Sequence, residues 1–536
     1  MTAAVDVQAT ASRWLDAEPD EDIRDELRAL LDGPSGELTA RFGGRLTFGT
    51  AGLRAEVGAG PLRMNRLVVR QATAGLAAYV LATDTRAGER GVVIGFDGRR
   101  KSDVFAMDTA RVMAAAGIRA LLLPGPVPTP VVAWSLTDLD AAAAVVVTAS
   151  HNPPQDNGYK VYLGDGAQIV PPHDAEISAR IAEFDPTTVA LSAHDDALIE
   201  RLGGSAVERY VASAPAARRT PEVPGVEVAY TPMHGVGGEI LLRAFAAAGL
   251  DAPAVVDAQF RPDATFPTVS FPNPEEPGAM DLVIALAAEG GAVLAIANDP
   301  DADRLGAAIP QPDGSWRRLG GDELGWLLAD HILRHTDGDD RFVVTTLVSS
   351  SLLGKMAADH GVHFAETFTG FKWIGRTVLD HPAWRFVFGY EQALGYLVVP
   401  RPLDKDGITA AVVLAEIAAA AAAAGTTLQA RLDEINDRYG RHVIVDRSIP
   451  MAPAVAAEVV RAMLQSPPSS LANAAVTAVE SYPEADLLRL ELAGGVRVQV
   501  RPSGTEPKVK LYAEAIDTDP TPYLNALARI LDSHEV

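Results

Sequence analysis

The sequence predicts an α/β protein of several domains, the last of which is built differently from the others. Short β-branched runs alternate with amphipathic helical stretches through most of the 536 residues, which is the pattern of α/β layers. A chain of this length holds roughly three or four domains of about 150 residues each. Towards the C-terminus, strand-like runs follow one another with only two helices, which indicates a smaller α+β domain with an antiparallel sheet.

Three rounds of strands and helices are expected before that last domain. The first has strands at 92–96, 120–123 and 143–147, with a helix at 105–116. The second has strands at 226–230 and 293–297 and helices at 239–248 and 281–289. The third has strands at 342–346 and 386–388 and helices at 323–333, 352–360 and 408–424. The last domain has strand-like runs at 443–446, 475–479, 487–492, 496–500 and 509–513.

Linkers are expected where polar or Pro/Gly-rich sequence interrupts these rounds, at 213–224, 310–320 and 436–441. The predicted domains are therefore 1–215, 216–318, 319–440 and 441–536. The first three share a layout, although no sequence repeat is evident between them.

The composition excludes several classes of protein. With 70 acidic and 46 basic residues the formal charge is −24, which argues against a nucleic-acid partner because such a protein needs a basic face. A phosphate ligand would need basic residues gathered locally. The chain has no cysteine, which excludes disulfides, thiolate catalysis and cysteine-based zinc sites.

We expect neither a signal peptide nor a membrane-spanning helix in this sequence. Its N-terminus lacks the basic start and apolar core of a signal peptide. The Ala-rich stretch 411–424 is interrupted by Glu416 and suits a packed helix better than a membrane span. We expect a cytoplasmic monomer or homodimer that acts on small molecules, without a nucleic-acid or membrane partner.

The most informative segment follows the predicted strand 143–147. Ser150 stands at the strand end, where a polar side chain can face a cleft from a rigid support. His151 and Asn152 adjoin it, and Lys160 follows in what we expect to be one short loop. A hydroxyl, an imidazole, an amide and an ammonium at one strand tip suit phosphate chemistry, although a polar turn between two strands would read similarly.

A second segment, after the predicted strand 293–297, has the pattern of a metal site. Asp299, Asp301 and Asp303 alternate in a tight loop, which like-charge repulsion disfavours unless a cation lies between them. Oxygen ligands favour a hard ion, Mg²⁺ most of all. An EF-hand loop is excluded, since its glycine position holds Arg304 and its closing glutamate position holds Pro310. Arg304 would orient either the metal loop or a phosphate.

Further segments suggest sugar and phosphate binding. Glu391, between glycines, could bridge two sugar hydroxyls, and the stretch from Thr369 to Trp373 adds an ammonium and an aromatic face. Lys405 has acidic neighbours, so it is either a surface ion pair or a placed proton donor. The segment 501–508 combines a guanidinium, two hydroxyls and a glycine, which is typical of a phosphate clamp. No dinucleotide-binding loop or P-loop occurs.

In combination these segments resemble the α-D-phosphohexomutase superfamily, which includes phosphoglucomutase and phosphomannomutase. The resemblance is carried by TASHNPP at 148–154, DPDADR at 299–304, GYEQALG at 389–395 and RPSGTEP at 501–507, supported by FGTAGLR at 48–54 and GFDGR at 95–99. TGFKWIG at 369–375 and DKDG at 404–407 lean toward the phosphoglucomutase and phosphopentomutase branches. The resemblance implies four domains around a central cleft, three similar mixed-sheet α/β domains and a C-terminal α+β domain, each contributing one loop.

The resemblance also implies roles for individual residues. Ser150 would carry a phosphoryl group, and Asp299, Asp301 and Asp303 would hold one Mg²⁺ together with it. The catalytic candidates beside Ser150 are His151, which would orient it, and Lys160, Arg54 and Lys405. The substrate-binding candidates are Arg304, Thr369, Gly370, Lys372, Glu391 and Ala393, and the phosphate-binding candidates are Arg501, Ser503, Gly504, Thr505 and Lys508.

The implied reaction converts a sugar 1-phosphate to the 6-phosphate, with a sugar 1,6-bisphosphate as intermediate and activator. Glucose phosphate is the first expectation and mannose phosphate the second. The alternatives are a phosphopentomutase acting on ribose or deoxyribose 1-phosphate, a phosphatase using the same serine, and a binding protein without catalysis. A phosphatase needs no second anion site, and a binding protein needs no Ser150. Ala393 stands where many hexomutases have serine, and Tyr396 where some have histidine.

Overall fold

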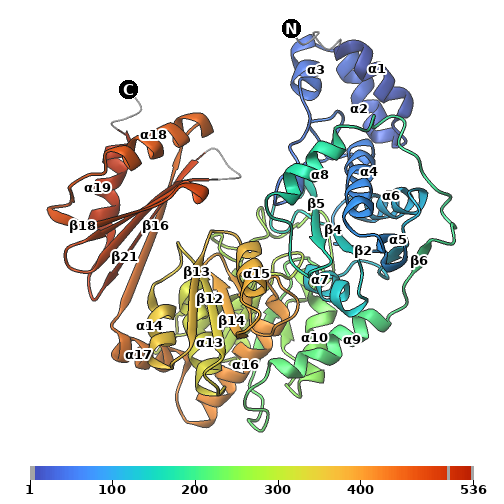
Figure 1. Cartoon of the computed structure of the whole chain (residues 1–536). Helices are drawn as coiled ribbons and strands as arrows, with labels where there is room; N and C mark the ends of the chain where they lie inside the picture. The colour runs from blue at the N-terminus through green and yellow to red at the C-terminus, as the bar shows by residue number, and fades with distance from the viewer. Residues whose placement is uncertain (1–6, 504–507, 533–536) are drawn as a thin grey trace.

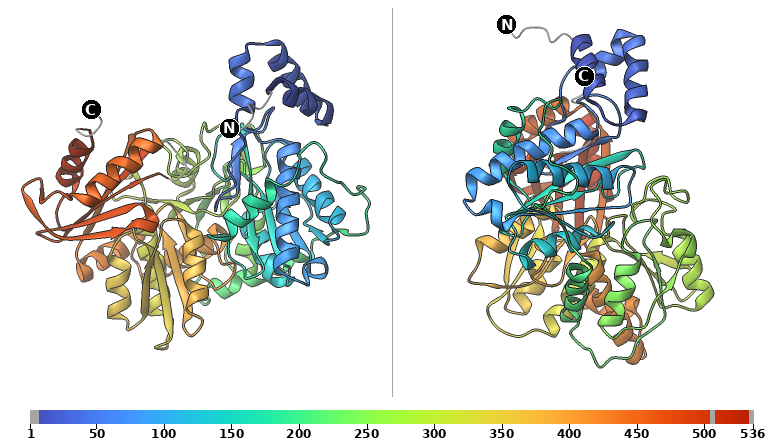
Figure 2. Two further views of the ribbon diagram at one scale, coloured as in Figure 1. Left: turned by 45° about the horizontal axis from the view of Figure 1, so that its top comes forward. Right: turned by 90° about the vertical axis from the view of Figure 1, so that its right-hand side faces the viewer.

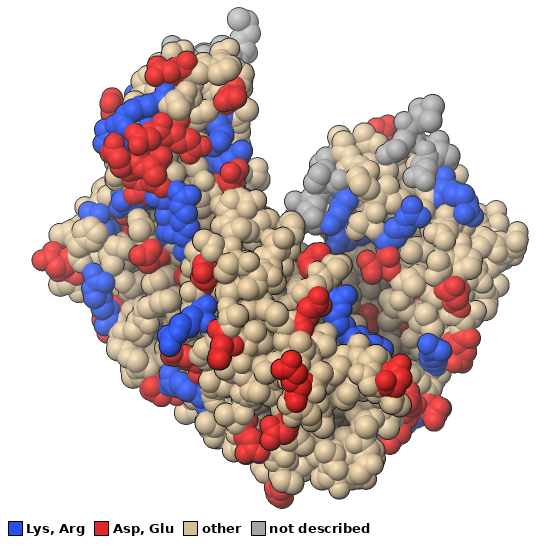
Figure 3. Space-filling view, turned by 180° about the vertical axis from the view of Figure 1, so that it is seen from behind, with Lys and Arg blue, Asp and Glu red and all other residues tan. Residues whose placement is uncertain are grey.

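The computed structural model describes residues 7–503 and 508–532, and this part of the chain folds into four β-sheets with surrounding helices (Figure 1). The sheets follow one another in chain order, so that the first and the C-terminal sheet stand on opposite sides of the molecule. Figure 2 shows the C-terminal sheet adjoining the third sheet, while the N-terminal helices rise above the first. A hollow separates these two ends in the space-filling view of Figure 3.

The first sheet carries the predicted serine segment at the end of one of its strands. Its strands are β1 (Leu53–Glu56), β2 (Val92–Phe96), β3 (Ala120–Leu122), β4 (Ala143–Val147), β5 (Asp156–Leu163) and β6 (Ile199–Arg201), and its helices are α4 (Arg66–Thr83), α5 (Ala87–Arg90), α6 (Ser102–Ala115), α7 (Thr129–Asp138), α8 (His173–Ile181) and α9 (Ser205–Ser213), with a 3₁₀ helix at Ala214–Ala217.

The strand order is β1-β5-β4-β2-β3-β6. Strands β4, β2, β3 and β6 are parallel to one another, and β5 pairs antiparallel with β4 on one side and with the edge strand β1 on the other. From β2 the chain goes to β3 on one side and then to β4 on the other. The carboxyl ends of β2 and β4 therefore form the switch point at which open α/β sheets bind ligands.

The second and third sheets repeat this plan on a smaller scale. The second has β7 (Val228–Thr231), β8 (Ala254–Val255), β9 (Leu294–Ala297), β10 (Gly306–Pro310) and β11 (Trp316–Arg318), with α10 (Gly238–Ala247), α11 (Asp257–Phe260) and α12 (Asp281–Gly290). The third has β12 (Arg341–Thr346), β13 (His363–Thr367), β14 (Arg385–Glu391) and β15 (Gly395–Leu397), with α13 (Gly321–Arg334), α14 (Leu352–Asp359), α15 (Phe371–Asp380), α16 (Gly407–Ala423) and α17 (Leu428–Tyr439). Each has a parallel centre and an antiparallel edge.

The C-terminal sheet is antiparallel throughout, in the order β16-β21-β20-β19-β18-β17. Its strands are β16 (His442–Pro450), β17 (Ser470–Leu471), β18 (Ala474–Tyr482), β19 (Leu487–Leu492), β20 (Val496–Pro502) and β21 (Lys508–Ile516), with helices α18 (Pro453–Gln465) and α19 (Thr521–Asp532) and a 3₁₀ helix at Pro483–Ala485. The predicted fold class, three mixed-sheet α/β domains and an α+β domain with an antiparallel sheet, is confirmed.

Three N-terminal helices precede the first sheet: α1 (Val7–Ala17), α2 (Glu21–Asp32) and α3 (Ser35–Phe42). They form an end of the molecule that the sequence did not predict (Figure 1). Asp20 anchors this unit, since its carboxylate lies 3.1 Å from Arg66 Nη1 and 2.8 Å from Lys101 Nζ.

The first three sheets share one continuous apolar core. A single cluster of buried side chains includes Trp134 of α7, Tyr210 of α9, Leu241 of α10, Leu328 of α13 and Val412 of α16. The C-terminal sheet has its own core against α18 and α19. The loops at the ends of β4, β9 and β14 are therefore mounted on one rigid base, because a close-packed interior resists relative movement of its parts.

No single helix in the described segments, 7–503 and 508–532, is long and apolar enough to cross a membrane. The pair α16 and α17 passes by length and composition together, but it bends by 92° at the break, and α16 is mostly buried inside the protein.

A buried carboxylate in α16 ties the base together. Glu416 Oε1 lies 3.1 Å from Arg218 Nε and accepts from the backbone N–H of Thr220, and its Oε2 lies 3.0 Å from His331 Nε2. Burial acts to raise the pKa of Glu416, but hydrogen bonds from His331 and from the backbone N–H of Arg219 lower it to about 2. The carboxylate thus joins the segment before the second sheet to two helices of the third.

Replacing Glu416 by glutamine should destabilise the protein by about 3 kcal/mol at pH 7, because Arg218 then stays buried without its counter-ion. The wild type loses this contribution as pH falls from about 4.5 towards 2, since its folded pKa is depressed. Denaturation curves of both proteins should therefore converge in acid. The exposed Glu434→Gln is the control, and a constant gap across pH would contradict the assignment.

Candidate active site

Ser150 lies in a turn shortly after β4, which ends at Val147. Its backbone has a φ of 53°, in the left-handed region, and its N–H donates to Thr148 Oγ1 at 2.8 Å. Ser150 Oγ donates to Asp299 Oδ2 at 2.8 Å and lies 3.2 Å from His151 Nδ1. A hydroxyl from the first sheet therefore contacts a carboxylate from the second.

Arg99 holds the serine loop from inside. Its Nη2 donates to the carbonyl oxygens of Ser150 and Asn152, and its Nη1 donates to those of Pro153 and Asp156 at 2.7 and 3.1 Å. The loop thus winds around a guanidinium whose side chain is only 1% exposed. Four converging carbonyl dipoles would repel one another without this charge, so Arg99 determines the shape of the loop.

Asp97 in turn holds Arg99. Its carboxylate lies 3.3 Å from Arg99 Nε and accepts from Thr148 Oγ1 and Ser102 Oγ, each at 2.7 Å. Because Phe96 and Val147 are in register, Asp97 and Thr148 stand side by side at the carboxyl ends of β2 and β4. The parallel pairing of two strands thereby positions Ser150.

The three aspartates converge as predicted. Asp299, Asp301 and Asp303 follow β9, are fully buried, and each directs one carboxylate oxygen to a place where the three oxygens lie within 4.8 Å of one another. Within the described residues, Asp301 Oδ1 and Asp303 Oδ1 have no hydrogen-bond partner. Buried carboxylate oxygens without partners are costly, so the group fits a bound cation.

Burial and the neighbouring carboxylates raise the pKa of Asp299 well above its usual range. For Asp301, burial acts in the same direction, but the ammonium of Lys160 lowers its pKa. The pKa of Asp303 is likewise lowered against burial and against Asp301, by Lys160 and Lys405. A divalent cation at this place would stabilise the ionised form of Asp299.

Lys160 and Lys405 both contact the aspartates. Lys160 Nζ lies 2.8 Å from Asp301 Oδ2 and 2.9 Å from Asp303 Oδ2, and Lys405 Nζ lies 3.2 Å from Asp303 Oδ2. The expectation that Lys160 follows Ser150 in a short loop is wrong. It lies in the middle of β5, which pairs antiparallel with β4, so its side chain projects from the sheet.

Other predicted side chains surround this centre. Arg54 on β1 approaches Asn152 Oδ1 at 3.5 Å, and burial together with the charges of Arg304 and Arg54 lowers the pKa of His151 well below its usual value. Arg304 Nη1 pairs with Glu275 at 3.2 Å. The basic residues that a phosphate ligand requires are thus gathered here, despite the acidic charge of the whole chain.

The predicted sugar segment forms a hairpin from β14 to β15. Glu391 ends β14, and its Oε1 accepts from Gly370 N at 3.0 Å, so the two predicted sugar loops contact each other. Lys372 Nζ reaches across to Thr50 Oγ1 of the first domain. Thr369 Oγ1 is buried without a hydrogen-bond partner among the described residues, and Ala393 offers no hydroxyl.

The predicted phosphate clamp lies on the hairpin between β20 and β21. Arg501 Nη2 donates to Tyr512 Oη at 3.4 Å, and Ser503 N donates to Lys508 O at 2.8 Å. Gly504 and Thr505 lie outside the described residues. The C-terminal sheet stands across the hollow from the first sheet, so the clamp and the serine loop come from opposite sides of the molecule (Figure 1).

Comparison with known proteins identifies the family. Residues 45–187, 208–314 and 320–439 match alpha/beta/alpha domains I, II and III of phosphoglucomutase/phosphomannomutase, and residues 450–521 match the C-terminal domain. The chain belongs to the phosphoglucomutase/phosphomannomutase family. It is therefore a phosphosugar mutase, an isomerase whose reaction is a phosphate transfer.

The similarity extends over most of the chain. A probable phosphomannomutase of Haemophilus influenzae is 42% identical over 466 residues, which cover 85% of this chain and 94% of the relative. Human phosphopentomutase is 34% identical over 573 aligned residues, covering 95% and 92%. The crystal structure of a putative phosphomannomutase from Thermus thermophilus superposes with a TM-score of 0.72 at 23% identity, covering 91% of this chain and 99% of that one, which shows a shared fold.

Asp97, Arg99 and Thr148 were not among the residues that the sequence analysis assigned to the site. GFDGR was recognised only as a family element, and the contacts of Arg99 join residues more than 50 positions apart. The signal available in the sequence was the group of polar residues that follows the buried strand β2, the neighbour of β4.

Arg99→Lys should lower kcat of the mutase on the order of tenfold to hundredfold with little change in KM, since a lysine cannot satisfy four carbonyls and the serine loop shifts. The exposed neighbour Arg100→Lys is the matched control. Steady-state kinetics on folded protein decide the point. A kcat equal to wild type in the Arg99 variant would show that the guanidinium does not position Ser150.

Proposed function

We propose that the protein interconverts a sugar 1-phosphate and the corresponding 6-phosphate through a phosphoserine at position 150 and a sugar bisphosphate intermediate. The contact of Ser150 Oγ with Asp299, at 2.8 Å, supports this most directly. It places a hydroxyl that can carry phosphate beside three carboxylates that suit a cation.

The reaction consists of two transfers. Phosphoserine 150 first gives its phosphoryl group to the free hydroxyl of the sugar monophosphate. A bond from the sugar oxygen to phosphorus forms, the bond from phosphorus to Ser150 Oγ breaks, and the proton of the sugar hydroxyl ends on Ser150 Oγ. The bisphosphate then turns in the cleft. Ser150 Oγ then takes the other phosphoryl group: the bond from that phosphorus to its sugar oxygen breaks, and the serine proton passes to this oxygen. The sugar is left with its phosphate at the other end.

The lysines would stabilise charge on the transferring group. Burial acts to lower the pKa values of Lys160 and Lys405, but the neighbouring carboxylates raise them. Both side chains therefore remain ammonium ions at neutral pH. We therefore assign them electrostatic stabilisation, with Arg54 assisting from β1. His151, kept neutral by burial and by the cations around it, would orient Ser150 Oγ.

Asp299, Asp301 and Asp303 would hold Mg²⁺ together with the phosphate on Ser150. The unpartnered oxygens of Asp301 and Asp303 fit this ion, which prefers oxygen ligands and shares its shell with phosphate. When bound, the ion would neutralise negative charge on the transferring phosphoryl group.

The phosphate that is not reacting would bind at the hairpin of the C-terminal sheet, to Arg501, Ser503 and Lys508 together with Gly504 and Thr505. Arg501 is half-buried, and its Nε has no hydrogen-bond partner among the described residues, so the guanidinium has donor capacity left for an anion. A second anion site of this kind serves a mutase, whereas a phosphatase does not need one.

Sugar recognition would rest on Glu391, Lys372, Thr369, Gly370 and Arg304. Gly370 engages one oxygen of Glu391, so the carboxylate is oriented before a sugar arrives. The side chain of Ala393 has no donor or acceptor for a sugar hydroxyl. We propose glucose phosphate as the first substrate and mannose phosphate as the second. Ribose phosphate is the alternative, which the similarity to human phosphopentomutase supports.

Initial rates on glucose, mannose and ribose 1-phosphates, with Mg²⁺ and a trace of the matching bisphosphate, test the proposal. Isomerised 6- or 5-phosphate should appear without free phosphate, and Ser150→Ala should abolish it. The exposed Ser205→Ala is the control. Release of free phosphate in place of isomerisation would contradict the role given to the clamp.

Removing divalent cations with a chelator should abolish turnover, and Mg²⁺ should restore it. Asp301→Asn should weaken Mg²⁺ binding, measured by calorimetry, by at least about tenfold because it removes one anionic ligand. The exposed Asp313→Asn should bind as the wild type does. Full activity after chelation would overturn the metal assignment.

A further inference from the structure

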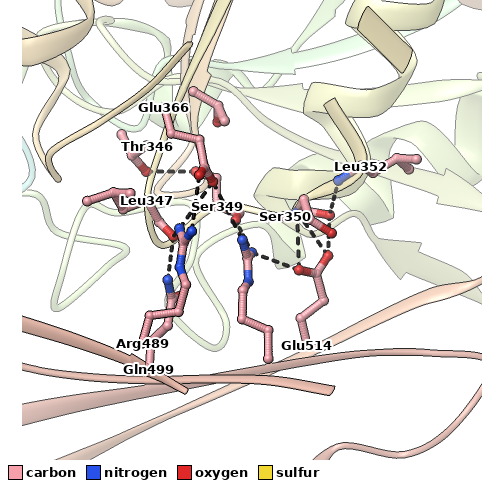
Figure 4. A network of polar contacts seen from close by, with 12 residues as sticks. Thr346, Leu347, Ser349, Ser350, Leu352, Glu366, Arg489, Gln499 and Glu514 are labelled. Atoms are coloured by element: carbon pink, nitrogen blue, oxygen red, sulfur yellow. Dashed lines mark hydrogen bonds and ion pairs between the residues drawn. The ribbon is translucent and has the colours of Figure 1, made fainter. Parts of the chain in front are cut away.

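A buried loop connects the C-terminal sheet to the sugar hairpin. This docking loop, residues 347–351, follows β12 and lies between the two (Figure 4). Leu347 is 3% exposed, and Ser349 and Ser350 are fully buried. None of the roles assigned above uses it.

One end of the docking loop is held by two side chains of the C-terminal sheet. The carbonyl oxygen of Leu347 accepts from Gln499 Nε2 at 2.6 Å and from Arg489 Nη2 at 2.9 Å. Arg489 also forms two hydrogen bonds of 3.1 Å with Glu366 of β13 (Figure 4). Bidentate pairs of this kind have a defined geometry, so they fix the loop against the sheet.

The other end is held by an ion pair. Arg497 Nη2 lies 2.7 Å from Glu514 Oε2 and donates to the carbonyl oxygen of Ser349. Glu514 Oε1 accepts from Ser350 Oγ at 2.6 Å and from Ser351 N at 3.1 Å. Against burial, Arg497 lowers the pKa of Glu514 to about 2, so the pair is charged at neutral pH.

The side chain of Ser349 points the other way, to the sugar hairpin. Its Oγ donates to Gln392 Oε1 at 3.0 Å and accepts from Gln392 N at 3.2 Å. Gln392 directly follows Glu391. Ser349 therefore makes both contacts. Its carbonyl oxygen accepts from Arg497, and its hydroxyl contacts Gln392, the neighbour of the proposed sugar ligand Glu391.

A second link runs in parallel. Ser350 N donates to Asp322 Oδ1 at 2.7 Å, and Tyr390 Oη donates to the same oxygen at 2.7 Å. Tyr390 immediately precedes Glu391 in β14. The hairpin is thus attached to the docking loop on both sides of Glu391.

Two of the side chains that hold the docking loop lie on the same strand as Arg501 of the proposed phosphate clamp. Arg497, Gln499 and Arg501 alternate along β20, so their side chains share one face. Arg501 lies about 13 Å along the strand from Arg497, at 3.3 Å per residue. The position of the clamp relative to Glu391 is therefore determined through the docking loop.

We propose that Ser349 is a positioning residue that keeps the sugar hairpin in register with the phosphate clamp, so that the docking loop sets the length of sugar phosphate the enzyme accepts. The inference rests on the proposed function, because it takes Glu391 as a sugar ligand and Arg501 as a phosphate ligand. Hexose 6-phosphate and pentose 5-phosphate differ by one carbon between these anchors. A displacement of about 1 Å is enough to change which of them reacts.

The kinetic test compares Ser349→Ala, Arg497→Gln and the double variant on glucose and ribose 1-phosphates. Each single change should move the ratio of the two kcat/KM values toward one by about fivefold, the effect of one hydrogen bond. The double variant should be no worse than the single ones, since both interrupt one path. Ser448→Ala and Arg447→Gln, exposed on β16, are the matched controls.

A general loss of stability would lower both rates together and leave their ratio unchanged. An unchanged ratio in folded Ser349→Ala, or effects of the two changes that multiply independently, would overturn the assignment of sugar length to the docking loop.

Hydrogen exchange tests the coupling without any sugar. Arg497→Gln should raise the exchange rates of backbone amides 389–395 at least about threefold, although Arg497 does not contact the hairpin. Unchanged exchange would overturn the coupling, whichever sugar the enzyme uses. If the wild type isomerises neither sugar, the proposed function fails and the claim about sugar length fails with it, while the exchange result still decides the coupling.

Discussion

Buried charges that must neutralise one another are the constraint on which the rest of the structure depends. Asp301 and Asp303 from the second domain are paired with Lys160 from the first and Lys405 from the third. None of these groups would tolerate burial alone, because an unpaired charge in the interior costs several kcal/mol. The three domains must therefore pack closely, and the continuous apolar core among Trp134 and its neighbours provides that packing.

The serine loop is also held by electrostatic compensation, here between backbone carbonyl dipoles and a buried charged side chain. Arg99 gathers the carbonyls of the loop, and Asp97 compensates its charge at the end of the adjacent strand. The strained φ of Ser150 is held in this way by its surroundings, which is where strain is expected in a preorganised site. In the proposed mechanism, the geometry at Ser150 thus depends on Arg99 and Asp97, which support the serine loop from inside the protein.

The C-terminal domain is attached by different physics. Its core is separate, and beyond the apolar contacts around Leu347 and Tyr512 and the packing of Ile444 it meets the third domain through buried hydrogen bonds and ion pairs. Directional polar contacts specify a position where apolar contacts tolerate sliding. The side of the cleft that carries the proposed phosphate clamp is therefore defined by a few residues, Arg497 and Glu514 foremost.

The sequence by itself determined the alternation of strands and helices, the fold class and the family, because periodicity and motifs are local properties of the chain. It also brought out Ser150 and the three aspartates, since each group stands at the end of a recognisable strand. Only the tertiary structure decided that Lys160 lies on a strand facing Asp301, that Arg99 supports the serine loop, and that Ser349 joins two domains. These contacts link residues far apart in the chain, and no local pattern encodes which strand ends meet.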